Sequence, residues 1–215
     1  MGRIHEISVP RGVVPHATRR PIGTANINNI LYLLEKTRDI PGDIAECGVF
    51  RGHSLVPIGI YLQQKQIPKS VFGFDSFEGF PATLTLDAQW TEAEGWKHAD
   101  FMAETSLDLV KAKLLLFQLE RIELVRGFFE ESLHKVSTRT FSFVHLDVDS
   151  YSSYKECISF FYPRLSSGGA MLFDEYNDPP WPGCNRAVDE FLSDKPEILK
   201  TIAKDNYEKY YIIKS

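Results

Sequence analysis

Residues 43–65 have the sequence DIAECGVFRGHSLVPIGIYLQQK, in which a short apolar run is followed by two glycines and a longer apolar stretch. The first part, DIAECGV, is typical of a buried strand, and HSLVPIGIYLQQK is typical of a helix with Ser54 near its start. Gly48 and Gly52 lie between them, where they allow a tight turn and let a ligand approach the backbone. A strand, a glycine turn and a helix in this order predict an α/β fold.

The same alternation continues along the chain. Further strands are predicted for VFGFDSF (71–77), RIELVRG (121–127), FSFVHLDVD (141–149), GGAMLFDEY (168–176) and YYIIKS (210–215). Further helices are predicted for TANINNILYLLEKTRDI (24–40), TSLDLVKAKLLLFQL (105–119), SSYKECISFFYPRL (152–165) and NRAVDEFLSD (185–194). Strands with mostly apolar interiors that alternate with helices predict a doubly wound, mostly parallel sheet covered on both faces. Ligands on such sheets bind beyond the carboxyl ends of the strands, near the point where strand order reverses.

The chain divides into an amino-terminal arm and one domain. Residues 1–24 are rich in Pro, Gly and Arg and predict an irregular arm. Residues 25–215 are of a suitable length for a single domain. Within it, residues 78–105 have little pattern and include Trp90 and Trp96, so we expect a substrate or lid insertion there.

Charge and composition narrow the classes of partner and the expected location of the protein. The formal net charge of −5 and pI of about 5.7 argue against nucleic acid as the main partner. No apolar run is long enough to span a bilayer, and MGRIHEISVP lacks the apolar region of a signal peptide. Three cysteines at unrelated spacings indicate neither a disulfide framework nor a zinc site, so we expect a cytoplasmic protein. A homodimer is a reasonable expectation for so short a chain with a detached arm.

The glycine turn and the second strand together suggest a cofactor. Asp75 ends the second strand, where an acidic side chain can accept hydrogen bonds from a ribose diol. Glu46, just before the turn, would repel a pyrophosphate but attract an ammonium group, and the full G-x-G-x-x-G of dinucleotide binders is missing. S-adenosylmethionine, which carries a ribose and an amino-acid zwitterion, fits this pattern. A purely structural role for the glycines stays open, because glycines are common where strands end.

The segment LVRGFFEES (124–132) is predicted to border the adenine of this cofactor. Gly127 would permit close approach, and Phe128 or Phe129 would offer an apolar face. Core packing is an equally good explanation of the phenylalanine pair.

Acidic residues follow two successive strands. The two-residue period of a strand places His145, Asp147 and Asp149 on one side of FSFVHLDVD. The next predicted strand ends with Asp174 and Glu175, which should reach the same edge of the sheet. Carboxylates held close together repel unless a cation lies beside them, and oxygen ligands of this kind suit Mg²⁺.

Two other interpretations apply to parts of this group. Asp149 or Ser150 could cap the helix that begins near Tyr151, which would explain one aspartate but not the others. His145 lies deeper in the strand, and we expect it to be a hydrogen-bonded core residue rather than a catalyst.

Five motifs, in this order and at this spacing, resemble the macrocin O-methyltransferase family, which includes the mycinamicin and novobiocin sugar methyltransferases. The motifs are GDIAECGVFRGHS (42–54), FGFDSFEGFP (72–81), LDVDSY (146–151), YPRLSSGGAMLFDEY (162–176) and GCNRAVDEF (183–191). The resemblance implies a seven-stranded class I methyltransferase fold that uses S-adenosylmethionine and a bound Mg²⁺. It also implies a metal held by Asp147, Asp174 and Glu175, Asp149 as general base, and a cofactor site lined by Glu46, Gly48, Ser54, Asp75 and Ser76.

The expected function is Mg²⁺-dependent methylation of a hydroxyl, on a sugar of a natural product or polysaccharide. The family usually has two aspartates where this chain has Asp174 and Glu175, so the third metal ligand stays open. The likeness is weak over residues 81–105, so the identity of the small-molecule acceptor does not transfer with the fold.

The sequence leaves two rival functions open, and it leaves two roles open for Trp181. The sequence DVD (147–149) also satisfies the D-x-D pattern of metal-dependent glycosyltransferases, although Glu46 in the glycine turn argues against a nucleotide-sugar. A non-catalytic binding module is the second alternative. Trp181, in the proline-rich segment 177–186, would either stack on an acceptor sugar or belong to a packed surface loop.

Overall fold

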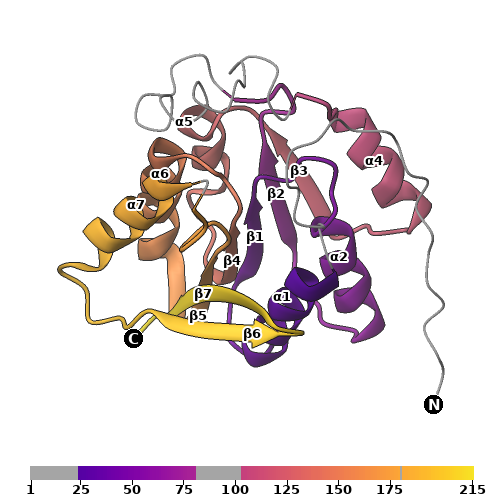
Figure 1. Cartoon of the computed structure of the whole chain (residues 1–215). Coiled ribbons are helices and arrows are strands. Elements are labelled where there is room, and N and C mark those ends of the chain that lie inside the picture. The colour runs from indigo at the N-terminus through magenta and orange to yellow at the C-terminus, as the bar shows by residue number, and fades with distance from the viewer. Residues whose placement is uncertain (1–23, 81–102, 180) are drawn as a thin grey trace.

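The computed structural model describes residues 24–80, 103–179 and 181–215. Within them, seven strands form one sheet in the order β3-β2-β1-β4-β5-β7-β6 (Figure 1). The strands are β1 (Asp43–Cys47), β2 (Val71–Asp75), β3 (Ile122–Arg126), β4 (Phe141–Leu146), β5 (Leu165–Phe173), β6 (Lys200–Lys204) and β7 (Tyr207–Ile213). The first five strands pair in parallel and β7 runs antiparallel to both β5 and β6, which confirms the predicted doubly wound, mostly parallel sheet.

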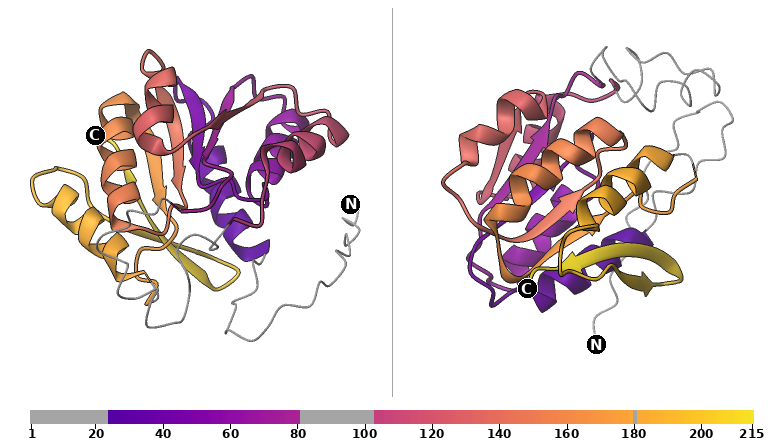
Figure 2. Two further views of the ribbon diagram at one scale, coloured as in Figure 1. Left: turned by 90° about the horizontal axis from the view of Figure 1, so that it is seen from above. Right: turned by 90° about the vertical axis from the view of Figure 1, so that its left-hand side faces the viewer.

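Helices cover both faces of the sheet (Figure 2). The helices are α1 (Thr24–Lys36), α2 (Leu55–Gln64), α4 (Leu107–Leu116), α5 (Phe129–Ser132), α6 (Tyr151–Phe161) and α7 (Pro182–Leu192), with short 3₁₀ turns at η2 (Leu133–Val136) and η3 (Tyr162–Arg164). Helices α1, α2 and α4 pack in one apolar cluster, and α6 and α7 pack in the other. All six residues of β4 are buried, as expected for a central strand covered on both sides.

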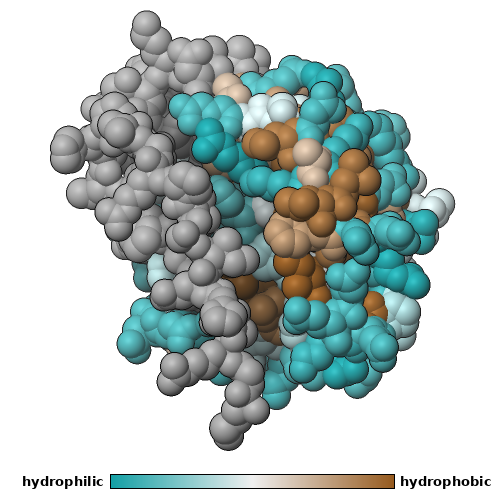
Figure 3. Space-filling model, turned by 90° about the vertical axis from the view of Figure 1, so that its right-hand side faces the viewer, coloured by the Kyte–Doolittle hydropathy of each residue, from teal (hydrophilic) through white to brown (hydrophobic). Residues whose placement is uncertain are grey.

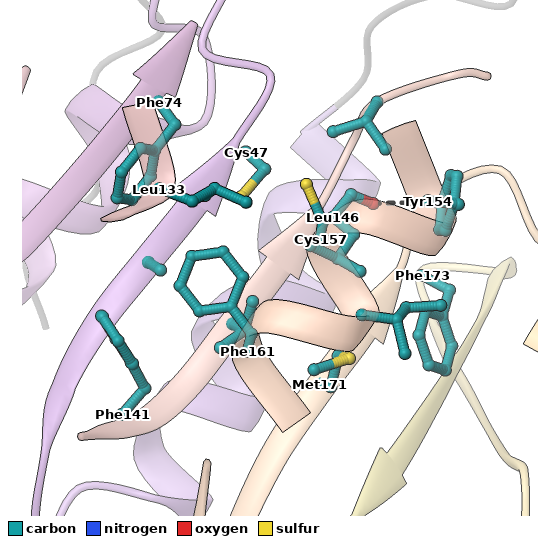
Figure 4. Packing of buried hydrophobic residues seen from close by; sticks show 14 of the residues in the cluster. Cys47, Phe74, Leu133, Phe141, Leu146, Tyr154, Cys157, Phe161, Met171 and Phe173 are labelled. Atoms are coloured by element: carbon teal, nitrogen blue, oxygen red, sulfur yellow. Dashed lines mark hydrogen bonds between the residues drawn. The ribbon is translucent and has the colours of Figure 1, made fainter. Parts of the chain in front are cut away.

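Aromatic packing anchors α6 to the sheet. Figure 4 shows Phe161 of α6 among the buried side chains of β4 and β2. Its ring lies 5.0 Å from that of Phe141 and 5.8 Å from that of Phe74, both edge-to-face. This geometry is favoured between aromatic rings and fixes the helix that follows the acidic segment.

Several elements differ from the sequence prediction, including β6, β4 and α7. Strand β6 was not predicted because four of its five residues are exposed, so it has no apolar pattern. It is an edge strand, joined to β7 by Asp205 and Asn206 in left-handed conformations. Strand β4 ends at Leu146 rather than at residue 149, and Asp149 itself lies outside the extended region, with a φ of 58°. Helix α7 begins at Pro182, inside the segment predicted to be a loop.

Parts of the domain prediction lie outside the described residues. This applies to residues 1–23 of the predicted arm, whereas Thr24 already begins α1. It also applies to residues 81–102, which include Trp90 and Trp96. Among the helices that the structure describes, none has the length and apolar character needed to cross a membrane.

Helix α4 leaves apolar side chains on the surface. Only Val110 and Leu114 of this helix are buried. Figure 3 shows hydrophobic residues gathered on the face that carries α2 and α4. Leu115 and Leu116 are the most exposed of the large apolar side chains of α4, at 78% and 75%. Apolar residues therefore lie on both sides of this helix.

Candidate active site

A cavity of about 710 Å³ opens at the carboxyl ends of β1, β2 and β4. Strand order reverses between β1 and β4, which is where ligands bind in doubly wound sheets. The described lining of the cavity includes nine of the predicted site residues: Gly48, Ser54, Asp75, Ser76, Gly127, Phe128, Asp147, Asp149 and Asp174. Glu46 and Glu175 are buried close to these residues but do not line the cavity. The volume suits a small organic ligand.

Gly48 brings the ends of β1 and β4 into contact. Its φ is 88°, and a Cβ atom built on it would lie only 1.7 Å from the carbonyl oxygen of Asp147. Its amide donates to the carbonyl of Phe74 in β2. Glycine is thus required by the backbone packing itself, whether or not a ligand is bound.

Asp75 organises the loops after β1 and β2. Its Oδ2 accepts the amide of Phe50 at 2.7 Å, and its Oδ1 accepts the amide of Phe77 at 2.6 Å. Burial raises the pKa of Asp75, and these backbone donors oppose that rise. A carboxylate can accept about four hydrogen bonds, so the side chain can still accept a ligand hydroxyl.

Two serines complete this side of the cavity. Ser54 occupies the N-cap position of α2, but its side chain makes no capping bond. Ser76 donates its hydroxyl to the carbonyl of Gly79 at 2.7 Å and accepts the amide of Glu78. Ser76 therefore holds a turn at the cavity edge, whereas the Ser54 hydroxyl remains suited to an anionic group. The opening amides of α2 contribute little, because Val56 already donates to the carbonyl of Gly52 and Pro57 has no N–H.

The segment after β3 supplies the opposite wall. Gly127 has a φ of 134° and donates its amide to the carbonyl of Asp75. Phe128 and Phe129 are half-buried and line the cavity, and Phe129 also packs against the core. Phe129 therefore both lines the cavity and packs in the core, so both explanations of the phenylalanine pair hold for it. The short helix α5 that follows was not predicted.

Acidic residues gather on the remaining side. His145, Asp147 and Asp174 each place a potential ligand atom within 4.8 Å of the others. Burial, together with the nearby charges of Asp174 and Glu175, raises the pKa of Asp147 well above its ordinary value. A divalent cation would relieve this repulsion, and carboxylate oxygens are ligands that Mg²⁺ accepts. The residues present therefore fit a bound Mg²⁺.

His145 belongs to this group, which the sequence prediction missed. Its Nδ1 lies 3.0 Å from Oε1 of Glu46, and its Nε2 lies 3.4 Å from Oδ1 of Asp174. Burial lowers its pKa, but the two carboxylates outweigh burial and raise the pKa to about 9. His145 is hydrogen-bonded in the core as expected, and it also joins the two sides of the cavity. The only signal in the sequence was the two-residue period, which places His145 on the same side of the strand as Asp147.

Glu175 faces the protein interior. Its Oε2 accepts the hydroxyl of Tyr154 at 2.6 Å and the amide of Asp149 at 3.3 Å. Ser150, and not Asp149, caps α6 by accepting the amide of Ser153 at 3.2 Å. Capping therefore does not explain Asp149, whose backbone Glu175 helps to hold in its left-handed conformation.

Trp181 is a packing residue. It is buried in the apolar cluster beneath α6 and α7, and its ring lies 6.4 Å from that of Phe80. It does not line the described cavity. Of the two explanations offered for Trp181, its burial supports packing within the loop.

The sheet order, with an antiparallel β7 beside β5 and a cavity at the β1–β4 reversal, is that of the class I methyltransferase fold. The family described as Macrocin-O-methyltransferase (TylF) matches residues 12–211. The chain therefore belongs to the macrocin O-methyltransferase family, which confirms the resemblance seen in the five motifs.

Individual relatives agree with this assignment. Mycinamicin III 3''-O-methyltransferase of Micromonospora griseorubida is 30% identical over 185 residues, which cover 82% of this chain and 71% of the relative. Demethyldecarbamoylnovobiocin O-methyltransferase of Streptomyces niveus is 27% identical over 191 residues, covering 86% and 72%. The structure of the O-methyltransferase NovP superposes with a TM-score of 0.77 at 25% identity, covering 90% of this chain and 81% of that one. The protein is an S-adenosylmethionine-dependent O-methyltransferase, so the glycosyltransferase and non-catalytic alternatives are set aside.

Proposed function

We propose that the protein transfers the methyl group of S-adenosylmethionine to a sugar hydroxyl of a natural product or polysaccharide, with Mg²⁺ bound beside the reacting oxygen. The observation that carries this proposal is that one cavity is lined by two sets of residues. Gly48 and Asp75 form one set, and Asp147, Asp149 and Asp174 form the other. The relatives named above act on mycinamicin III and on demethyldecarbamoylnovobiocin, which supports a glycoside acceptor.

The cofactor is proposed to span the cavity from α2 to α5. Asp75 would accept the ribose hydroxyls, and Gly127 with Phe128 would border the adenine. Ser54 would bind the methionine carboxylate through its hydroxyl. Glu46 would attract the ammonium group, and it has one buried carboxylate oxygen, Oε2, without a partner in the described structure.

The acidic residues are proposed to serve the acceptor. Asp147 and Asp174 would hold Mg²⁺, with Glu175 as the third candidate ligand. When bound, the ion supplies a positive charge that lowers the pKa of the substrate hydroxyl. Asp149 would accept the hydroxyl proton while the oxygen attacks the methyl carbon. The new carbon–oxygen bond forms as the carbon–sulfur bond breaks, and S-adenosylhomocysteine leaves.

Calorimetric titration with S-adenosylhomocysteine, with and without Mg²⁺, tests the proposal. We expect micromolar binding in both conditions and clear weakening in Asp75→Ala. Methyl transfer to glycoside acceptors should stop on chelation and return when Mg²⁺ is added. Binding without any metal requirement for turnover would remove Mg²⁺ from the proposal, and no binding in either condition would contradict the cofactor site. A homodimer stays a prediction, which sedimentation analysis can check.

A further inference from the structure

Four ionisable side chains form a continuous row across the middle of the sheet. The row consists of Glu46 in β1, His145 in β4, Asp174 just after β5 and Lys209 in β7, and these four strands are neighbours. Glu46 contacts His145, His145 contacts Asp174, and Asp174 contacts Lys209. We name these residues the buried row. It connects the glycine-turn side of the cavity with β7.

Lys209 is attached to Asp174 by two hydrogen bonds. It is only 4% exposed, and its Nζ donates both to the carbonyl oxygen of Asp174 and, at 2.8 Å, to Oδ2 of Asp174. Phe173 and Tyr210 are the last paired residues of β5 and β7, so the lysine side chain continues the attachment where the backbone ladder ends. Both the main chain and the carboxylate of Asp174 are therefore held by one ammonium group.

The other oxygen of Asp174 is held from two directions. Its Oδ1 accepts the side-chain amide of Asn26 at 2.5 Å and lies 3.4 Å from Nε2 of His145. A carboxylate with a donor on each oxygen is confined to one orientation, here the one that brings it within reach of Asp147. Hydrogen bonds of this kind to metal-binding carboxylates set their orientation and contribute to metal affinity.

We propose that Lys209 is a positioning residue of the divalent-metal site, acting by fixing the carboxylate and backbone of Asp174. This inference rests on the proposed function, because it takes Asp147 and Asp174 as the metal-binding pair. Lys209 was not singled out in the sequence, where a lysine in a strand ordinarily predicts an exposed position.

The alternatives make different predictions for removal of the ammonium group. If Lys209 positions Asp174, its removal weakens metal binding and leaves cofactor binding intact. A lysine that competes with the metal for Asp174 would have the opposite effect, so that its removal strengthens metal binding. If Lys209 only stabilises the β6–β7 hairpin, any comparable damage to the hairpin has the same effect.

Mn²⁺ binding, measured from the electron paramagnetic resonance signal of the free ion, tests Lys209→Met in the full-length protein. We expect Mn²⁺ affinity to fall about 10- to 100-fold, while calorimetric affinity for S-adenosylhomocysteine without metal stays unchanged. The matched control is Asn29→Ala. Asn29 is buried and bonds the carbonyl of Tyr207 at 2.7 Å and the amide of Lys204 at 2.8 Å, so this change loosens the same hairpin without touching Asp174.

Each outcome is decisive. No Mn²⁺ binding by the wild type contradicts the proposed metal site and the role of Lys209 with it. The role of Lys209 alone is overturned if the wild type binds Mn²⁺ and Lys209→Met leaves the affinity unchanged or increases it. The same holds if Lys209→Met lowers the affinity only as much as Asn29→Ala does. If Lys209→Met does not fold, Lys209→Gln is measured instead, because glutamine keeps a donor and similar bulk, and the same ordering is expected.

Discussion

The two sides of the cavity are built in different ways. On the cofactor side, Asp75 accepts backbone amides from Phe50 and Phe77, and Gly48 meets the backbone of Asp147. On the acidic side, side chains from four strands contact one another in the buried row. The cofactor side thus depends mainly on backbone geometry, and the acidic side depends on the mutual effect of charges.

Asp147 and Asp174 illustrate the difference. Burial raises the pKa of both carboxyl groups, and for Asp147 the neighbouring Asp174 and Glu175 raise it further. For Asp174 the ammonium of Lys209 and the imidazole of His145 outweigh burial and lower the pKa below its ordinary value. Two aspartates whose ligand atoms lie within 4.8 Å thus hold their protons very differently. A change on the acidic side should therefore spread to its neighbours, whereas a change on the cofactor side should stay local.

The largest expected effect is on turnover in Asp149→Asn. Loss of a general base typically reduces rate by about a hundred- to ten-thousandfold, and the amide cannot accept the proton. Single-turnover methyl transfer measures the rate, and affinity for S-adenosylhomocysteine should be retained. Glu156→Gln, a second acidic residue lining the cavity, serves as the control and should keep most activity. Near-normal turnover in Asp149→Asn would mean that another group accepts the proton.

Gly48→Ala should be the most disruptive change on the cofactor side. The new methyl group would overlap the Asp147 carbonyl, so we expect a loss of stability on the order of 3 kcal/mol and loss of detectable cofactor binding. Gly52→Ala is the matched control, because its Cβ would meet nothing closer than 3.4 Å and its cost, about 1 kcal/mol, comes from its φ alone. Denaturant unfolding compares the two, and equal losses would show that the contact with Asp147 is unimportant.

Asp75→Ala should weaken binding of S-adenosylhomocysteine about 10- to 100-fold, since hydrogen bonds to a charged group contribute roughly 1.5–3 kcal/mol. Ser76→Ala removes a neutral hydroxyl from the same edge and should weaken binding less, by about two- to tenfold. Calorimetry measures both. If Asp75→Ala also changed Mn²⁺ affinity strongly, the two sides of the cavity would not be independent.

The smallest expected effect is a pH dependence of stability from Asp75. Because burial raises the pKa of Asp75 in the folded protein, its protonated form favours folding, and this contribution is lost as pH rises through the raised pKa. Asparagine does not titrate. The free energy of unfolding of Asp75→Asn relative to the wild type should therefore increase with pH over that range. Urea unfolding at a series of acidic to neutral pH values checks the slope, and a flat difference would contradict the raised pKa.

Local pattern alone determined much of this protein. The alternation of strands and helices, the glycine turn at Gly48 and the acidic end of β2 at Asp75 are visible in the sequence, because each depends on neighbours along the chain. Motif order added the family, and with it the expectation of seven strands. The carboxyl ends of β1, β2 and β4 could be expected to meet, because parallel strands deliver their ends to one edge.

Only the tertiary structure decided the rest. Strand β6 has no apolar pattern of its own and forms because β7 offers it an edge. The roles of His145 and Lys209 depend on strand order and register, which place them against Glu46 and Asp174 from distant parts of the chain. The burial of Trp181 depends in the same way on the apolar cluster that α6 and α7 form. Periodicity indicates which face of a strand a residue occupies. Its partners across the sheet are set by packing between elements, and these partners decide whether each ionisable group is charged.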